Sequence, residues 1–231
     1  MKTQKIVAVI SGGMDSITML HLLAKHSERE VVEALSFNYG QRHIKELDEA
    51  KWNCDKLEIP HKIIDVSFLA QLLDQSALTG DIEVPEGHYE QDNMALTVVP
   101  NRNMILASIA IGRAANLEAD AIALGVQSGD HVIYPDCRPE FISALRTASL
   151  IANYQSIDVL TPFLHDDKTS IIAFDDLVEL NVDYAHTWTC YKGGDLACGK
   201  CGSCQERLEA FANNDLEDPL SYETRELIEE K

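Results

Sequence analysis

The N-terminal segment predicts a β-strand, a glycine turn and an α-helix in direct succession. The run KIVAVI has the length of a core strand, SITMLHLLAKH has apolar residues at helical spacing, and SGGMDS connects them. Gly12 and Gly13 permit positive φ angles and let backbone N–H groups approach an anion, which the start of a helix also attracts. The turn therefore predicts phosphate binding, although Asp15 and Ser16 stand where a common P-loop has Lys followed by Ser or Thr. A capped turn without a ligand is the alternative.

Strand and helix patterns continue to alternate along the chain. A strand at 31–37, a helix at 44–58 and a strand at 61–66 complete a βαβαβ order, which favours a parallel sheet. We therefore predict an α/β fold of Rossmann-like type, with a parallel sheet that is covered by helices on both faces. Ligands of such sheets bind at the carboxyl ends of the strands, here the loops 11–16 and 38–43. Later patterns predict helices at 103–118, at 139–152, from 168 and at 204–214, and strands at 121–126 and 157–163.

The domain organisation follows from where these patterns stop. The segment 68–97 is acidic, is interrupted by Gly and Pro and has no clear periodicity, so we expect a long excursion that forms a lid or a partner contact. The sequence has no linker of the kind that separates two large domains. We predict one catalytic domain at 1–185, which includes the excursion, and a small metal-binding segment at 186–231 that packs on it.

The charge of the chain limits its partners. It has 38 Asp and Glu against 19 Lys and Arg, a net charge of -19, and a field of this sign repels nucleic acid and anionic membranes. The apolar runs are shorter than the roughly 18 residues of a membrane span. The N-terminal apolar run is broken by glycines, so it is a core strand rather than a signal peptide. We therefore expect a cytoplasmic protein that binds small molecules and binds neither nucleic acid nor membrane.

Four of the six cysteines lie in one short stretch. CYKGGDLACGKCGSC places Cys190, Cys198, Cys201 and Cys204 in the spacing C-x7-C-x2-C-x2-C. Each C-x2-C pair can place two thiolates on one ion, and four thiolates predict a closed, structural Zn²⁺ site. An iron–sulfur cluster also accepts four thiolates, and disulfides or free thiols are the remaining alternatives. Cys54 is expected in the core, because its helix is amphipathic.

The glycine turn resembles a loop of known function. SGGMDS is similar to the SGGxDS pyrophosphate loop of the N-type ATP pyrophosphatases, the PP-loop superfamily. The resemblance implies an adenine nucleotide α-hydrolase-like fold, ATP with Mg²⁺, attack of a substrate oxygen on the α-phosphorus, and release of pyrophosphate. The missing lysine agrees with this chemistry, because the leaving group is pyrophosphate rather than a transferred γ-phosphoryl group; Asp15 is an expected contact of the Mg²⁺. The residues expected to bind the nucleotide are Ile10, Ser11, Gly12, Gly13, Met14, Asp15, Ser16, Ile17, Thr18, Met19 and Leu20.

Further stretches narrow the resemblance. NYGQRH, VPNRN, GVQSGDHVIYPDCRPEFI, TPF followed by Lys168, and WTCYKGGDLACGKCGSC occur in this order and resemble the 7-cyano-7-deazaguanine synthase family from about residue 5 to residue 212. That family uses ATP to convert 7-carboxy-7-deazaguanine and ammonia into the nitrile precursor of queuosine, through an adenylated acid and an amide. Its members often form homodimers, so a homodimer is expected. One departure is Asn101, where many members have Gly.

Charged residues in these stretches are the candidates for catalysis. We predict Asp15, Arg42 and Lys168 as catalytic residues. The two cations would stabilise the charge that develops on the α-phosphate and on the leaving group. For each cation the alternative is an ion pair at the surface.

Other residues are candidates for substrate binding. Arg102 stands at a predicted helix start, where it either binds the substrate or anchors the loop. Asp136 and Arg138 are predicted to contact the guanine-like face, because a carboxylate accepts hydrogen bonds from an N–H edge. Tyr134 or Trp188 could stack on a planar ring.

Three other functions are compatible with parts of the pattern. A tRNA-modifying relative would keep the loop, but it would need a basic surface and often a reactive cysteine pair, which the net charge and the predicted metal site argue against. A related ligase would join the activated deazapurine acid to an amine other than ammonia, and the sequence separates this poorly. The intact loop and the supporting polar motifs disfavour a nucleotide sensor without catalysis.

Overall fold

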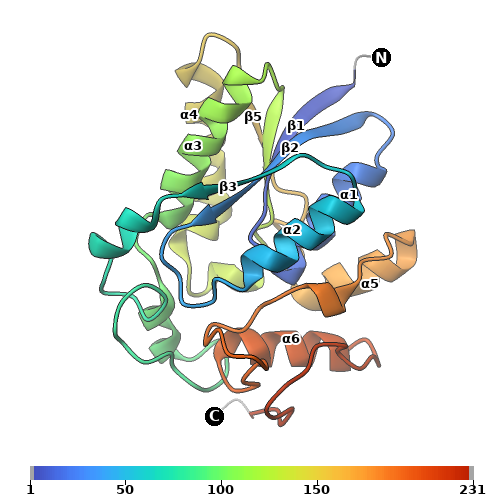
Figure 1. Ribbon diagram of the computed structural model, residues 1–231. Helices are drawn as coiled ribbons and strands as arrows, with labels where there is room; N and C mark the ends of the chain where they lie inside the picture. The colour runs from blue at the N-terminus through green and yellow to red at the C-terminus, as the bar shows by residue number, and fades with distance from the viewer. Residues whose placement is uncertain (1–2, 229–231) are drawn as a thin grey trace.

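A computed structural model describes residues 3–228 (Figure 1), so the outermost positions of the predicted segments 1–185 and 186–231 lie outside the described residues. Parallel strands form one sheet in the order β3-β2-β1-β4-β5. The strands are β1 (Gln4–Val9), β2 (Arg29–Asn38), β3 (His61–Asp65), β4 (Ala121–Leu124) and β5 (Asp158–Leu160). The helices are α1 (Met14–Lys25), α2 (Glu46–Lys56), α3 (Arg102–Asn116), α4 (Pro139–Ala152), α5 (Lys168–Val178) and α6 (Gly202–Ala212).

Helices cover both faces of the sheet, which confirms the prediction (Figure 1). Val7, Leu35 and Ile122 pack toward α3 and α4, whereas the neighbouring Ala34 and Ala121 pack toward α1 and α2. This difference follows from the strand period, which turns successive side chains to opposite faces. All five side chains are buried, so the strands appear in the sequence as continuous apolar runs rather than as alternating ones.

The strand order reverses between β1 and β4. β1 continues through α1 to β2 on one side of the sheet, while β4 and β5 extend the sheet on the other side. Ligands of open α/β sheets bind in the crevice that opens at such a reversal. The end of β4 approaches the glycine loop closely there, since a Cβ on Gly125 would lie 2.7 Å from Cα of Ser16.

Some boundaries differ from the prediction for identifiable reasons. β5 ends at Leu160 rather than at 163, because the nearby Pro162 has no N–H for the strand ladder. β4 ends at Leu124, where Gly125 turns toward the glycine loop. Asn101, just before α3, has a left-handed φ of 58°. Gly adopts this conformation freely, and Asn adopts it more readily than most other residues do. Asn101 can therefore form the same turn as a Gly at this position.

The excursion 68–97 is irregular, as predicted, and packs against the C-terminal segment. The N–H of Gly87 donates to the carbonyl of Lys200 at 2.9 Å. Val84 belongs to an apolar cluster that also contains Trp188 and the four clustered cysteines. The excursion and the cysteine stretch thus share a small core of their own, beside the two cores of the sheet.

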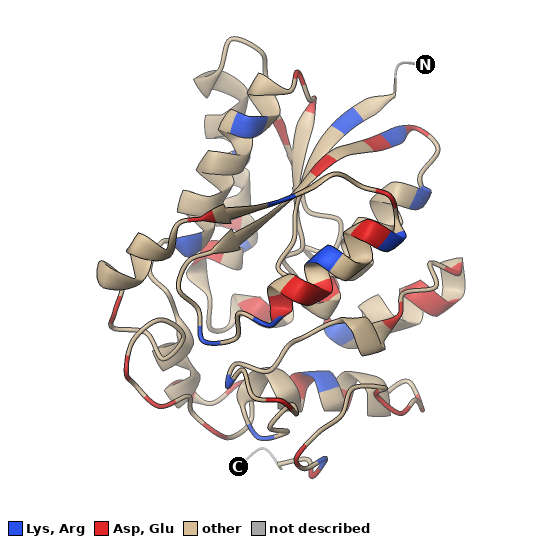
Figure 2. Ribbon diagram, viewed as in Figure 1, with Lys and Arg blue, Asp and Glu red and all other residues tan. Residues whose placement is uncertain are grey.

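The surface is acidic over many elements. Asp and Glu occur on α2, α5 and α6 and in the loops, with fewer Lys and Arg among them (Figure 2). Among the helices of residues 3–228, none is both long and apolar enough to cross a membrane.

Candidate functional site

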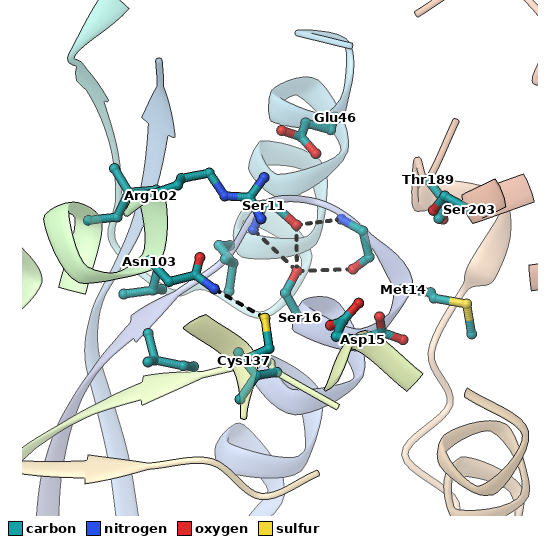
Figure 3. A pocket seen from close by; sticks show the side chains of 18 of the residues that line it. Ser11, Met14, Asp15, Ser16, Glu46, Arg102, Asn103, Cys137, Thr189 and Ser203 are labelled. Carbon is teal, nitrogen blue, oxygen red and sulfur yellow. Dashed lines mark hydrogen bonds between the residues drawn. The ribbon is translucent and has the colours of Figure 1, made fainter. Parts of the chain in front are cut away.

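A cavity of about 230 Å³ lies where the sheet order reverses (Figure 3). It is lined by the glycine loop, the end of β2, the starts of α2, α3 and α5, and the C-terminal stretch 188–206. Apolar side chains such as Phe37, Leu106 and Leu124 share the lining with several charged groups. A nucleotide requires such a mixture, because its base is apolar and flat while its phosphates are anionic.

The glycine loop is held by its own serines (Figure 3). The N–H of Ser11 donates to Ser16 Oγ at 3.2 Å, the N–H of Gly13 donates to Ser11 Oγ at 3.1 Å, and Ser16 Oγ donates to the carbonyl of Gly13 at 3.0 Å. Gly12 has a φ of 102°, and a Cβ there would lie 1.9 Å from the carbonyl oxygen of Glu46, so only glycine fits. Helix α1 begins directly after Gly13. The N–H groups and positive dipole end of its first turn can therefore bind an anion in the cavity.

Lys168 lies among three carboxyl groups. Its Nζ is 3.0 Å from Asp15 Oδ2 and 2.8 Å from Glu206 Oε2. Burial opposes the charge of Lys168, but the carboxylates of Asp15, Glu206 and Asp130 outweigh it and hold the pKa of Lys168 well above its usual value. The buried cation therefore persists at neutral pH, beside the loop that can bind an anion.

One carboxylate oxygen of Asp15 has no hydrogen-bond partner. Its Oδ1 is buried and has no hydrogen-bond partner, while Oδ2 contacts Lys168. Burial raises the pKa of Asp15, an effect that Lys168 partly offsets. A free carboxylate oxygen beside an anion site is a ligand that Mg²⁺ prefers, so Asp15 fits a metal that arrives with a nucleotide.

A second polar group lines the cavity at the start of α2. Glu46 accepts a hydrogen bond from Gln41 Nε2 at 2.9 Å, and His43 Nε2 lies 3.5 Å from the same oxygen. Burial raises the pKa of Glu46 to about 8 and lowers the pKa of His43 to about 3. His43 Nδ1 is buried without a partner, and Arg102 donates to the Tyr39 hydroxyl at 3.3 Å. Buried polar groups that lack partners indicate a polar ligand.

Three predicted residues do not line the cavity. Arg42 is exposed and donates to a carbonyl of the excursion 68–97. Asp136 accepts from the N–H of Asn103 at 2.9 Å, next to the start of α3, and Arg138 is exposed and donates to a nearby carbonyl at 2.8 Å. The structure therefore does not bring these three side chains together with the loop, because each points to a neighbouring loop or helix end.

The residues predicted to bind the nucleotide divide into three groups. Gly12 is not part of the cavity lining, and its carbonyl accepts the N–H of Trp188, a lining residue, at 2.9 Å. The residues that line the cavity are Ile10, Ser11, Gly13, Met14, Asp15 and Ser16. The residues buried within α1, outside the lining, are Ile17, Thr18, Met19 and Leu20.

Several lining residues were not predicted as site residues. Cys137 is buried, and Asn103 Nδ2 donates to its Sγ at 3.2 Å (Figure 3). Most of the unpredicted residues belong to the motifs quoted in the sequence analysis. Those motifs located the region of the site, but they did not show which of their side chains face the cavity. Glu206 had no such signal beyond its position near Cys204. The unpredicted polar residues of the lining are Tyr39, His43, Glu46, Asn103, Asp130, Cys137, Thr189, Tyr191, Ser203 and Glu206.

The four predicted metal ligands come together. Cys190, Cys198, Cys201 and Cys204 are buried, and their Sγ atoms lie within 4.8 Å of one another. The N–H groups of Cys198, Lys200 and Cys201 donate to sulfur atoms of the cluster at 3.3 Å. Such bonds favour the thiolate form that binds metals. The cluster can therefore hold a metal ion with four sulfur ligands.

A buried ion pair fixes the chain after the cluster. Arg207 in α6 and Asp218 are both fully buried, and two guanidinium nitrogens donate to the two carboxylate oxygens at 2.7 and 2.9 Å. Arg207 also donates to the carbonyl of Tyr184 at 2.9 Å and to Thr187 Oγ1 at 2.7 Å. This pair joins the stretch before the cysteines, α6 and the tail that follows it.

Comparisons with known proteins agree with this architecture. Residues 5–215 match the family described as Queuosine biosynthesis protein QueC. The 7-cyano-7-deazaguanine synthase of Hahella chejuensis is 55% identical over 220 residues, which cover 95% of this chain and 94% of that protein. The 7-cyano-7-deazaguanine synthase of Pseudoalteromonas translucida is 52% identical over 221 residues, which cover 96% of this chain and 100% of that protein. Because both matches span nearly the whole chain, the protein belongs to the QueC family of queuosine biosynthesis proteins.

Proposed function

We propose that the protein converts 7-carboxy-7-deazaguanine and ammonia into 7-cyano-7-deazaguanine with ATP, and that it releases AMP and pyrophosphate. The observation that carries the proposal is the cavity in which the SGGMDS loop and the buried Lys168 meet, in a chain whose relatives are named for this product. The loop offers donors for phosphate but no cation of its own, and Lys168 supplies the cation from α5.

The chemistry requires activation by ATP. A carboxylate is a poor electrophile, because its leaving group would be oxide. Attack of a carboxylate oxygen on the α-phosphorus forms a P–O bond and expels pyrophosphate; ammonia then forms the C–N bond, and AMP leaves with the oxygen. A second ATP adenylates the amide oxygen, and loss of AMP and protons leaves the C≡N group. Each adenylation places negative charge on the α-phosphate and the pyrophosphate.

The residues around the loop suit this charge. The hydroxyl groups of Ser11 and Ser16 and the N–H groups at the start of α1 would bind the pyrophosphate. Lys168 would stabilise the charge that develops as the P–O bond to the leaving group breaks. The free Oδ1 of Asp15 would hold the Mg²⁺ that accompanies ATP, and this ion, when bound, neutralises part of the phosphate charge.

For the deazaguanine ring we propose Glu46 in place of Asp136 and Arg138. Glu46 lines the cavity, and it has no cation of its own within ion-pair distance among the lysines and arginines of the described residues. Once ionised, Glu46 would accept hydrogen bonds from the adjacent N–H groups of a guanine-like edge, as carboxylates do from base edges. Such bonds would favour the charged form of Glu46, which burial alone disfavours. Arg102, on the same lining, would donate to an oxygen of the substrate. Arg42 reaches ATP only if its side chain leaves the excursion carbonyl.

The cysteine cluster is proposed to hold one structural Zn²⁺. Four sulfur ligands leave no open position for catalysis. An iron–sulfur cluster is the alternative, and its visible absorbance would identify it. We further propose that the protein works in the cytoplasm as a homodimer. We also propose that it has no nucleic-acid partner, since its net charge of -19 repels nucleic acid.

Product analysis tests the proposed reaction. The protein is incubated with ATP, Mg²⁺, ammonium and 7-carboxy-7-deazaguanine, and the nitrile, AMP and pyrophosphate are expected by mass spectrometry. Production of ADP and phosphate would refute adenylation, and a product that requires another amine would refute ammonia as the acceptor. Lys168→Gln is expected to lower the rate by about 10²-fold or more. Lys51→Gln removes an exposed cation that pairs with Asp55 on α2 and serves as the matched control.

A further inference from the structure

A second, much smaller cavity adjoins the main one. It measures about 20 Å³ and shares Asp130, Tyr191, Ser203 and Glu206 with the lining of the larger cavity. A volume of this size holds about one particle as large as a water molecule. The small cavity therefore has room beside the reaction site for one small molecule and for nothing the size of a nucleotide or a deazaguanine.

The lining of this small cavity offers acceptors. The Asp130 carboxylate has no hydrogen bond or ion pair to any described residue, although it lines both cavities. Glu206 accepts from Gln127 Nε2 at 2.9 Å and pairs with Lys168. The Tyr134 hydroxyl bonds to the Tyr191 hydroxyl at 2.9 Å and to Thr97 Oγ1 at 2.7 Å, and each tyrosine oxygen keeps a lone pair that can accept a further hydrogen bond.

The carboxyl groups near Lys168 outnumber this lysine, so they would attract a second cation. Lys168 pairs with the carboxyl groups of Asp15 and Glu206, and the Asp130 carboxyl acts on it from beyond ion-pair distance, so three carboxyl groups share one lysine. The faces of tyrosine rings also attract cations. Mg²⁺ suits this lining poorly, because it keeps several waters in near-octahedral geometry and the space accommodates about one water-sized particle.

We propose that this small cavity binds ammonium, held by the Asp130 carboxylate and the tyrosine hydroxyls, and delivers it to the acyl-adenylate in the main cavity. The inference rests on the proposed function, which requires ammonia as the nucleophile. Ammonium carries four N–H donors, and the carboxylate and hydroxyl oxygens of the lining are acceptors.

Ammonium must lose a proton before it can attack. Asp130 can take that proton: an N–H bond of ammonium breaks, an O–H bond forms on the carboxylate, and neutral ammonia keeps the electron pair that forms the C–N bond. Burial raises the pKa of Asp130 to about 7, with Lys168 opposing the rise, so this carboxyl is a better proton acceptor than an exposed aspartate.

Steady-state kinetics with Asp130→Asn test the proposal. The KM for ammonium is expected to rise by about tenfold or more, because a charged acceptor is lost, while the KM for ATP stays within about twofold. Asp166→Asn is the matched control: its side chain is exposed, lines neither cavity and removes the same charge nearby. An unchanged KM for ammonium in Asp130→Asn would overturn the proposal. A raised requirement for Mg²⁺ would overturn it too, since the cavity would then be a metal site.

A partial reaction separates this proposal from the proposed function. Exchange of labelled pyrophosphate into ATP, driven by the carboxylate substrate without ammonium, reports the first adenylation alone. Asp130→Asn is expected to retain this exchange, which also shows that the variant is folded. Loss of exchange in the variant would overturn the ammonium site, whereas absence of exchange in the unmodified protein would refute the proposed function itself.

Discussion

Asp218→Asn removes one charge from the most deeply buried ion pair in the described residues. The Arg207 and Asp218 side chains are both 0% exposed, and Asp218 also accepts from the Tyr222 hydroxyl at 2.7 Å and the N–H of Leu220 at 3.0 Å. Asparagine keeps the shape but leaves the guanidinium without a counter-charge in a medium that solvates it poorly. The substitution therefore tests how much the tail after α6 depends on this pair.

The size of the effect follows from the burial. Breaking a fully buried pair from one side costs about 3–5 kcal/mol, because an uncompensated charge remains. For a chain of this length each kcal/mol lowers Tm by about 2–4 °C, so we expect a decrease of roughly 6–20 °C. Urea unfolding of the metal-loaded protein, followed by tryptophan fluorescence and circular dichroism, measures the free energy. A loss below about 1 kcal/mol would show that the reasoning from burial is wrong.

A surface pair in the same region provides the control. Glu217 lies 3.8 Å from Arg225, with side chains 86% and 39% exposed. Glu217→Gln is expected to change the free energy of unfolding by less than about 1 kcal/mol, because water screens an exposed pair. A double-mutant cycle with Arg207→Met adds a second check, since contacting groups couple by about 0.5–3 kcal/mol. Additive effects of the two substitutions would contradict a direct pair.

Other perturbations have expected outcomes of their own. Cys198→Ser combined with Cys201→Ser should abolish metal binding in elemental analysis and lower Tm; unchanged metal content would exclude the four-sulfur site. Glu46→Gln should stabilise the fold more near pH 8 than near pH 5. Burial raises the pKa of Glu46 to about 8 in the folded protein, so the folded state binds this proton more tightly than the unfolded chain does. The stability of the wild-type protein therefore falls as the pH rises from the unfolded pKa of Glu46 to its folded pKa, and glutamine removes this loss. Urea titrations at both pH values measure this, and an equal effect at each would contradict the assigned pKa. Gly12→Ala should cost more than about 1 kcal/mol, because its φ is 102° and a Cβ would meet the Glu46 carbonyl. Gly112→Ala, with no atom near its Cβ, should be neutral or stabilising in the same thermal melts.

Most of the sheet was predictable because local patterns encode it. A strand buried on both faces is an apolar run, and the strand expected at 31–37 is found as Arg29–Asn38. The excursion 68–97 behaves differently, because its path depends on contacts with the distant cysteine stretch, such as the hydrogen bond from Gly87 to Lys200. No local period carries that information, so the sequence predicted only its irregularity.

At the site, motifs located the regions but not the directions of side chains. Arg42 and His43 are neighbours in NYGQRH, and the charge of Arg42 made it the natural candidate, yet His43 is the buried one that lines the cavity. The same holds for Asp136 and Cys137, of which only the cysteine lines the cavity. Which of two adjacent residues faces inward depends on the exact start of the next helix, and helix starts are the least certain feature of a sequence pattern.

Glu206 was beyond prediction for a different reason. It reaches Lys168 because α6 packs against α5, and this contact joins parts of the chain that are far apart in sequence (Figure 1). The cysteine spacing predicted that the four thiols would meet, but not that the following helix would carry a carboxylate into the cavity.

The hydrogen bond from the Trp188 N–H to the Gly12 carbonyl has a practical consequence for enzymology. Trp188 lies two positions before the first clustered thiol, Cys190, so the wall of the cavity and the four-cysteine cluster share one short piece of backbone. If the cluster holds the proposed metal, we expect a molecule that lacks it to lose the support of the glycine loop along with the cluster. Turnover numbers should therefore be normalised to bound metal rather than to total protein, because a partly loaded preparation contains fewer competent active sites than polypeptide chains.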